Sequence, residues 1–173
     1  MEPQELIEVS EKNRRGMDRR VGVTMAVFAA CLAIVTLMGH RLHTEEVVLQ
    51  TKLADQWAYY QAKNTRSQMY ATDAALAMLQ GAQGARLATG WNDKANDERR
   101  QADEIRHANE ELDRETRLTA RRAAFFDSSE VFFEIAIVLC SIALLTGAGR
   151  FWQVAFVSAV LGVIASAMGF LRS

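Results

Sequence analysis

Five side chains that could bind a metal ion or relay protons lie in two short segments far apart in the chain. His40 and His43 are three residues apart, and Asp127, Glu130 and Glu134 follow at steps of three and four. Those steps place the carboxylates on one side of a helix. Imidazole and carboxylate groups ligate Zn, Mn and Fe, and they are also the groups that proton relays use. If the two segments meet, this set could therefore form a metal site or a proton pathway.

A structural role is the favoured interpretation of the same five residues, and no metal site is predicted. In a hydrogen-bonded network, His and Arg side chains would neutralise the acids and keep two helices in register. Two histidines three residues apart also occur often by chance, so no cofactor is predicted. Glu134 is the most informative member, because an ionised carboxylate in hydrocarbon costs several kcal/mol unless it is paired, protonated or in contact with water. We therefore expect Glu134 to face inward.

Three apolar stretches must position these residues: 21–39, 131–149 and 151–171. The first and third contain no Asp, Glu, Lys or Arg, and the second contains only Glu134. Each approaches the roughly 20 apolar residues that cross a bilayer as a helix. The sequence predicts an all-α membrane protein with three transmembrane helices. The first span leaves the membrane on the side where the second enters, so the two histidines can stand opposite the three carboxylates.

The segment 40–130 between the first two spans carries most of the charge, and the segment 1–20 is a polar N-terminal extension. Pro3 is the only proline, so long helices are allowed everywhere after it. Glycines and polar residues at 81–93 favour a chain reversal there. We expect 40–130 to form a long extramembrane helical hairpin, coiled-coil-like, with its tip near 81–93.

A second helix boundary is predicted where the returning arm enters the membrane. Asp127 can cap a helix, and Glu130 three residues later can bond back to the cap amide. Phe126 and Val131 have the spacing of a hydrophobic staple. The pattern predicts a helix break at 126–131.

Two further patterns predict contacts between helices. Aromatic side chains cluster on the first arm of the expected hairpin, where they would pack against a partner helix or bind another molecule. Small residues every four positions in the third span would present a groove to a neighbouring helix, in the same chain or in another copy. The aromatic residues are Trp57, Tyr59 and Tyr60, and the small residues are Ser158, Gly162 and Ser166.

Charge and motif content exclude several classes of function. The 20 basic and 21 acidic residues are interspersed, so nucleic acid is not expected as a partner. Cys31 and Cys140 fall near the middle of predicted spans, where a thiol behaves as a small apolar group. No phosphate-binding glycine loop, Cys-x-x-Cys pair, zinc-protease motif or nucleophile elbow occurs in the sequence. We therefore expect a protein that is not an enzyme.

Basic residues give an expected orientation. The polar N-terminus, with no cleavage site after the first span, indicates an uncleaved signal anchor. Arg150 lies between the second and third spans, and five basic residues precede the first: Lys12, Arg14, Arg15, Arg19 and Arg20. By the positive-inside rule these ends are cytoplasmic and the hairpin lies outside. Three arginines at the opposite ends weaken this signal: Arg41, Arg121 and Arg122.

Several stretches resemble the signature of a bacterial membrane family catalogued as domain of unknown function 4337. They are GHRLHTEE (39–46), LQTK (49–52), DQWAYYQAK (55–63), ARRA (120–123), FD (126–127), EV (130–131) and EIAIVLCS (134–141). The resemblance covers the chain from about Arg20 to the third span. It implies a small protein of the bacterial inner membrane with three spans and a helical excursion, and no established activity, cofactor or substrate.

The family pattern includes six of the residues considered above: His40, His43, Trp57, Asp127, Glu130 and Glu134. The resemblance assigns no role to them. Members often carry a His-rich N-terminus, and its absence here weakens a metal role by that route.

The function predicted from these observations is a non-enzymatic, membrane-anchored helical scaffold. A sparse apolar stripe on a long charged hairpin is not well buried by two helices, so other copies or a larger membrane complex would supply the missing surface. Membrane lipid and a second copy are the expected partners. The alternative is an oligomeric channel or a proton- or ion-coupled transport accessory that uses Glu134.

Overall fold

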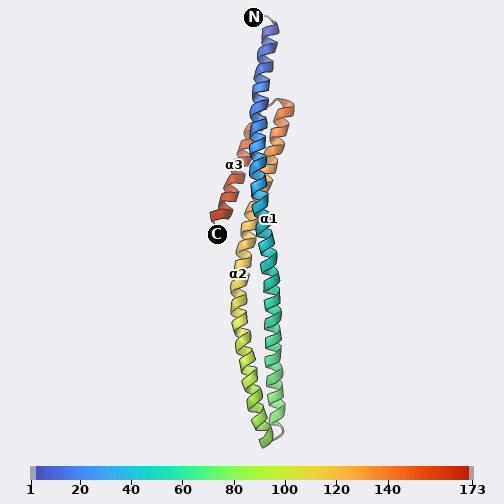
Figure 1. The fold of residues 1–173 in the computed structure, drawn as a ribbon, viewed down its shortest axis with the longest axis vertical. Coiled ribbons are helices and arrows are strands. Elements are labelled where there is room, and N and C mark those ends of the chain that lie inside the picture. Colours follow the sequence, from blue (N-terminus) through green and yellow to red (C-terminus); the bar gives the residue numbers. More distant parts are fainter. Residues whose placement is uncertain (1–2, 172–173) are drawn as a thin grey trace. The chain divides into compact units, whose positions relative to one another are not determined.

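The protein is built from three α-helices in the part of the chain that the structure describes. The computed structural model describes the backbone of residues 3–171 and the side chains of residues 16–171. Within these limits there is no strand, and the helices are α1 (Pro3–Met78), α2 (Ala82–Thr146) and α3 (Gly149–Leu171) (Figure 1). Each contains a segment long and apolar enough to cross a membrane. The predicted all-α class and the three apolar helices are confirmed, and they indicate a membrane protein.

The turn between α1 and α2 is shorter than the sequence suggested. It occupies residues 79–81, and Gly81 has a φ of 76°, which side-chain-bearing residues rarely adopt. The rest of the predicted tip at 81–93 is helical. Gly84 serves a different purpose, because a Cβ there would overlap the backbone carbonyl of Ala77. One glycine therefore turns the chain, and a second lets the two helix ends approach closely.

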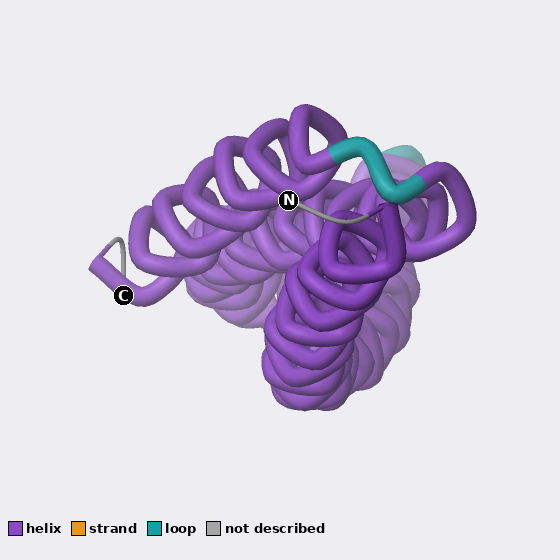
Figure 2. The backbone as a smooth tube through the Cα atoms, turned by 90° about the horizontal axis from the view of Figure 1, so that it is seen from above, coloured by secondary structure: helices purple, strands orange, loops and turns teal. Residues whose placement is uncertain are grey.

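The connection between α2 and α3 also depends on one glycine. Gly147 has a φ of 67°, and its amide donates to the Ala143 carbonyl at 2.9 Å. Thr146 Oγ1 accepts a hydrogen bond from the Ala148 amide at 3.3 Å. Figure 2 shows the result, in which helices account for nearly all of the backbone and the loops are short.

The helix break predicted at 126–131 does not occur, because α2 continues through it. Within a continuous helix the backbone amides at this point already have partners, so the side chains are not needed as caps. Asp127 instead contacts His43 on α1, and Ser129 Oγ donates to the Gly162 carbonyl of α3 at 2.7 Å. The polar residues that resembled a helix start connect helices instead.

The chain divides into two compact units, here called unit 1 (Met1–Thr44 and Thr119–Ser173) and unit 2 (Glu45–Leu118). In unit 1, buried side chains recur every seven residues along α1 and along α2. This spacing forms a continuous stripe on each helix that can face its neighbour. The buried residues with this spacing are Val21, Phe28, Val35 and Leu42 on α1, and Phe126, Phe133 and Cys140 on α2.

The third helix packs on both other helices of unit 1. Phe156 of α3 makes an edge contact with Phe28 of α1, with ring centroids 5.5 Å apart. Ser158 Oγ donates to the Phe132 carbonyl of α2 at 2.7 Å. A Cβ at Gly162 would lie 3.1 Å from a ring carbon of Phe133, so only glycine fits there without a shift. Small residues on α3 therefore permit close packing against α2.

Unit 2 consists of the second part of α1 and the first part of α2. Residues further along α1 contact residues progressively earlier on α2, so the two segments run antiparallel. The pairs are Lys63 with Glu98, Ser67 with Ala95, and Tyr70 with Trp91. Its buried apolar side chains are small. They are Ala74, Ala77, Ala88, Ala95 and Ala102.

Candidate functional site

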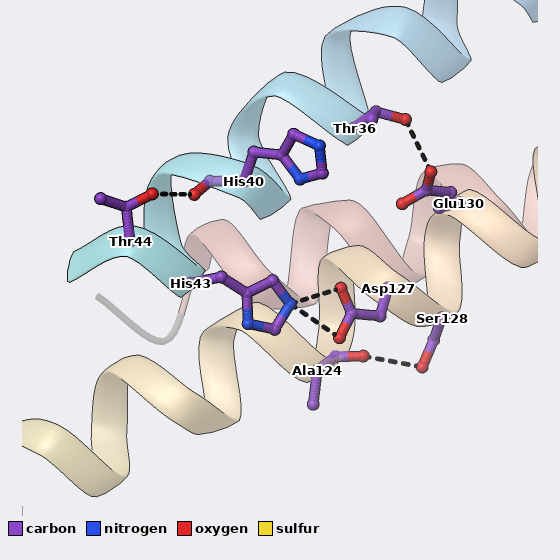
Figure 3. A network of polar contacts seen from close by, with 8 residues as sticks. All are labelled: Thr36, His40, His43, Thr44, Ala124, Asp127, Ser128 and Glu130. Atoms are coloured by element: carbon purple, nitrogen blue, oxygen red, sulfur yellow. Dashed lines mark hydrogen bonds and ion pairs between the residues drawn. The ribbon is translucent and has the colours of Figure 1, made fainter. Parts of the chain in front are cut away.

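Two polar pairs connect α1 and α2 within unit 1 (Figure 3). Thr36 Oγ1 donates to Glu130 Oε1 at 2.9 Å. His43 Nε2 lies 3.0 Å from Oδ1 and 3.2 Å from Oδ2 of Asp127, and it donates to this carboxylate when the proton is on Nε2. Because Thr36 and His43 are seven residues apart, both lie on the face of α1 that meets α2.

The His43–Asp127 pair is half exposed. The side chains of His43 and Asp127 are 47% and 49% exposed. Water screens charges at this level of exposure, so the ion pair contributes little to stability when His43 is protonated. An exposed imidazole held by a carboxylate can still exchange protons with its surroundings.

The other predicted members of this set lie elsewhere on the surface. His40 is exposed, and in Figure 3 only its backbone carbonyl takes part, as acceptor for Thr44 Oγ1 at 2.8 Å. Glu134 is also exposed, which differs from the expectation that it faces inward. Phe133 occupies the inward position at this level of α2 and is 2% exposed. The helix rotation that buries Phe133 turns Glu134 outward.

The arrangement does not assemble a metal centre among the residues whose side chains are described. In that part of the chain no group of three or more His, Cys, Asp or Glu side chains is placed to hold a metal ion. Of the five predicted residues, only His43 and Asp127 are brought into contact with one another. Glu130 instead pairs with Thr36, which sequence reasoning missed. The signal that could have predicted this pair is the seven-residue step from Thr36 to His43, because it places both side chains on the same face of α1.

The predicted aromatic cluster of unit 2 is partly buried and partly exposed. Trp57 and Tyr60 are half buried and contact each other edge to face at 5.4 Å. Tyr59 is exposed, and Lys63 Nζ lies 5.7 Å from its ring centroid. A second aromatic pair, Tyr70 stacked on Trp91 at 5.4 Å, was not anticipated, because its members are distant in sequence.

The interface between α1 and α2 in unit 2, here called the seam, contains buried polar groups that composition alone does not reveal. Lys63 Nζ lies 3.0 Å from Glu98 Oε2, and the two side chains are only 10% and 16% exposed. Asn109 is fully buried, and neither atom of its amide has a hydrogen-bond partner among the residues that the structure describes. Asn109 lines a cavity of about 290 Å³ together with Lys52, Gln56, Ala108, Glu111, Leu112 and Glu115.

Two of the three small residues predicted to form a groove on the third span contact α2 of the same chain. Ser158 bonds to the Phe132 carbonyl, and the Gly162 carbonyl accepts the bond from Ser129. Ser166 donates instead to the Val163 carbonyl of its own helix at 2.9 Å. The groove is therefore filled along part of its length by α2.

Comparison with known proteins identifies the family. No curated protein and no solved structure gives a significant match. One family model, described as domain of unknown function (DUF4337), matches residues 17–172, which includes the apolar segments of all three helices and the His43–Asp127 pair. The resemblance noted in the sequence is thereby confirmed, and this protein belongs to the DUF4337 family.

Proposed function

We propose that this protein is a membrane-anchored helical scaffold without enzymatic activity, and that it assembles with further copies of itself. One observation carries the proposal: Glu134 is exposed on an apolar helix that is long enough to cross a membrane. Its neighbours Val131, Ile135 and Val138 are exposed as well. A carboxylate on a lipid-facing surface costs several kcal/mol. Contact with a second copy along this face of α2 would shield it from hydrocarbon.

The composition of unit 2 supports the same proposal. Its fully buried apolar residues are alanines, and several of its larger apolar side chains are at least half exposed: Val47, Val48, Tyr59, Met69, Leu76, Leu87 and Leu118. Exposed apolar groups in this number favour a partner surface. We place unit 2 outside the membrane as an extramembrane, coiled-coil-like hairpin, because charged residues interrupt it throughout.

The proposed location follows from charge and from the family resemblance. The apolar segments would cross the cytoplasmic membrane of a bacterium, with the N-terminus inside and unit 2 on the outer side. Support comes from Arg19, Arg20 and Arg150 at one end of the apolar segments.

Glu134 also favours a second candidate function. In an oligomer, several copies of this carboxylate could line a path for protons or cations, because intramembrane acids commonly mark such pathways. The protein would then be a channel or an accessory of a proton-coupled transporter. Three spans in one copy are few for a carrier, so this function also requires assembly.

Substitution of Glu134 by Gln separates the two candidates. The mass of the protein in detergent is measured by size-exclusion chromatography with light scattering, and ion flux is measured after reconstitution into liposomes. A scaffold predicts an oligomer that weakens in Glu134→Gln, with no flux from either protein. Unchanged assembly with flux lost in the variant supports transport.

Glu104→Gln is the matched control. Glu104 is an exposed acid on the same helix, outside the apolar segment, so its substitution should leave the assembly unchanged. A wild-type protein that is a stable monomer, with no other protein purified alongside it, would contradict both candidates.

A further inference from the structure

An open cavity of about 580 Å³ lies between α1 and α3 in unit 1. It is lined by Gly16, Arg19, Arg20, Val23, Thr24 and Trp152. Trp152 is held in place by a hydrogen bond from Nε1 to Thr24 Oγ1 at 3.4 Å. Its indole also makes an edge contact with the Phe156 ring, with centroids 5.3 Å apart. One wall of the cavity is therefore a fixed aromatic ring, and the volume is in the range of small-molecule sites.

The polar part of the lining is cationic. Arg19 and Arg20 are exposed, and neither forms an ion pair with a residue whose side chain the structure describes. Asp18, the acid in the same turn, does not line the cavity. Guanidinium groups bind phosphate through paired hydrogen bonds and keep their charge at any physiological pH. The chemistry that would recognise this lining is that of a phosphate group.

The cavity lies where polar sequence meets apolar sequence. Arg20 directly precedes the apolar stretch 21–39, and Trp152 is the second residue of the stretch 151–171. Tryptophan is enriched at the level of lipid headgroups. A free phosphate ion would use the two guanidinium groups only. A phospholipid would use them for its phosphate and would place its glycerol and acyl chain against Val23 and Trp152.

We propose that this cavity binds the phosphate of an anionic phospholipid. Basic pockets between helices at the membrane surface have the charge and shape for such headgroups. The proposal depends on the membrane placement proposed above and does not depend on self-association. It assigns Arg19 and Arg20 to the headgroup and Trp152 to the boundary with the acyl chain.

Quenching of Trp152 fluorescence by brominated lipids tests the proposal. The chain has three tryptophans, and Trp57→Phe with Trp91→Phe leaves Trp152 as the only one. The full-length variant is reconstituted into phosphatidylcholine vesicles that contain increasing fractions of brominated phosphatidylglycerol. A second series contains brominated phosphatidylcholine at the same fractions. The expected result is half-maximal quenching at a severalfold lower fraction of the anionic lipid.

Substitutions at the two arginines test the assignment of the headgroup. Arg19→Gln with Arg20→Gln should lower the apparent affinity for the brominated anionic lipid by about tenfold, since each basic side chain near the surface contributes to attraction of acidic lipid. Arg19→Lys with Arg20→Lys keeps the charge and should restore most of the preference. Arg41→Gln with Arg121→Gln is the matched control, because both arginines are exposed and lie near the opposite ends of the apolar segments. This control should leave the preference unchanged.

Four outcomes would overturn the proposal. Equal quenching by the two brominated lipids would show membrane placement without a lipid site. Loss of the preference in the control pair as large as in the Arg19 and Arg20 pair would show attraction by overall charge alone. Displacement of the anionic lipid by inorganic phosphate would assign the cavity to a free anion. The absence of quenching by either lipid would remove the membrane placement itself.

Discussion

Unit 1 and unit 2 use the same seven-residue spacing but fill it with different side chains. On α1, the spacing places Val21, Phe28, Val35 and Leu42 in the interior of unit 1. In unit 2, the same spacing on α2 places Ala88, Ala95, Ala102 and Asn109 in the interior. The same spacing therefore supports an interface of bulky apolar side chains in unit 1 and an interface of small, partly polar side chains in unit 2.

The difference matches the solvents that we propose for the two units. In lipid, apolar contact adds little drive for helix association, so close packing and hydrogen bonds must hold the helices together. Unit 1 has both, in the Gly162 contact and in the Ser129 and Ser158 hydrogen bonds. In water, burial of large apolar groups is the main drive. In unit 2 the fully buried apolar residues are alanines and the larger ones are at most partly buried, so two helices alone give it a modest stability.

The largest expected effect comes from filling the close contact in unit 1. Gly162→Leu places a side chain where a Cβ already meets Phe133 at 3.1 Å and Phe132 Cβ at 3.3 Å. The helices α2 and α3 must separate, which should lower the free energy of unfolding by about 3 kcal/mol. The measurement is thermal unfolding in detergent, followed by circular dichroism.

Gly90→Leu is the control for this substitution. Gly90 also lies within a helix, but apart from the adjoining backbone of that helix no atom of the described residues lies within 4 Å of an added Cβ, and leucine is the better helix former. This variant should be neutral or slightly more stable. Equal losses at the two positions would contradict the claim that α3 is held by close packing.

The second effect concerns the Lys63–Glu98 pair in the seam of unit 2. Lys63→Met leaves Glu98, which is 16% exposed, with Arg66 Nη1 at 4.0 Å as its one remaining basic partner among the described residues. Loss of the partner of a nearly buried charge should lower the free energy of unfolding by about 2 kcal/mol. The double variant Lys63→Met with Glu98→Leu removes both charges and should recover most of that loss, measured by urea unfolding.

A double variant as unstable as Lys63→Met would indicate that the pair itself, and not the stranded carboxylate, stabilises unit 2. The stability of unit 2 would then depend on this ion pair more than its alanine-lined seam suggests.

A third substitution tests whether polarity in the seam lowers stability. Asn109 is fully buried with an unpartnered amide, so Asn109→Leu should raise the free energy of unfolding by about 1 kcal/mol. A buried asparagine between helices also fixes their register at some cost in stability. The variant should therefore give a second antiparallel register in disulfide mapping with introduced cysteine pairs, and the wild-type background should give one. A destabilised variant with one register would show that the Asn109 amide is satisfied by water.

Composition was sufficient to predict the three apolar helices, because uninterrupted apolar length is a property of the sequence alone. Local turn chemistry was less informative. Gly81 forms the turn, whereas Gly90 lies within a helix, because pairing of the two arms decides where the chain reverses. The direction of Glu134 could not be predicted either, since it depends on whether Phe133 or Glu134 takes the inward position. The seven-residue spacing of Phe126, Phe133 and Cys140 was the pattern that indicated the inward position of Phe133.

The smallest expected effect belongs to the pair that first suggested chemistry. His43 and Asp127 are about half exposed, so Asp127→Asn should change the free energy of unfolding by less than about 1 kcal/mol. Added salt should reduce that change further, because exposed charges are screened over a Debye length. Thr36→Val, which removes the donor to the less exposed Glu130, should have the larger effect of the two. Urea unfolding at low and high salt provides the measurement. A larger loss for Asp127→Asn, unchanged by salt, would place this pair in a less solvated environment than its exposure indicates, as a contact with another copy would produce.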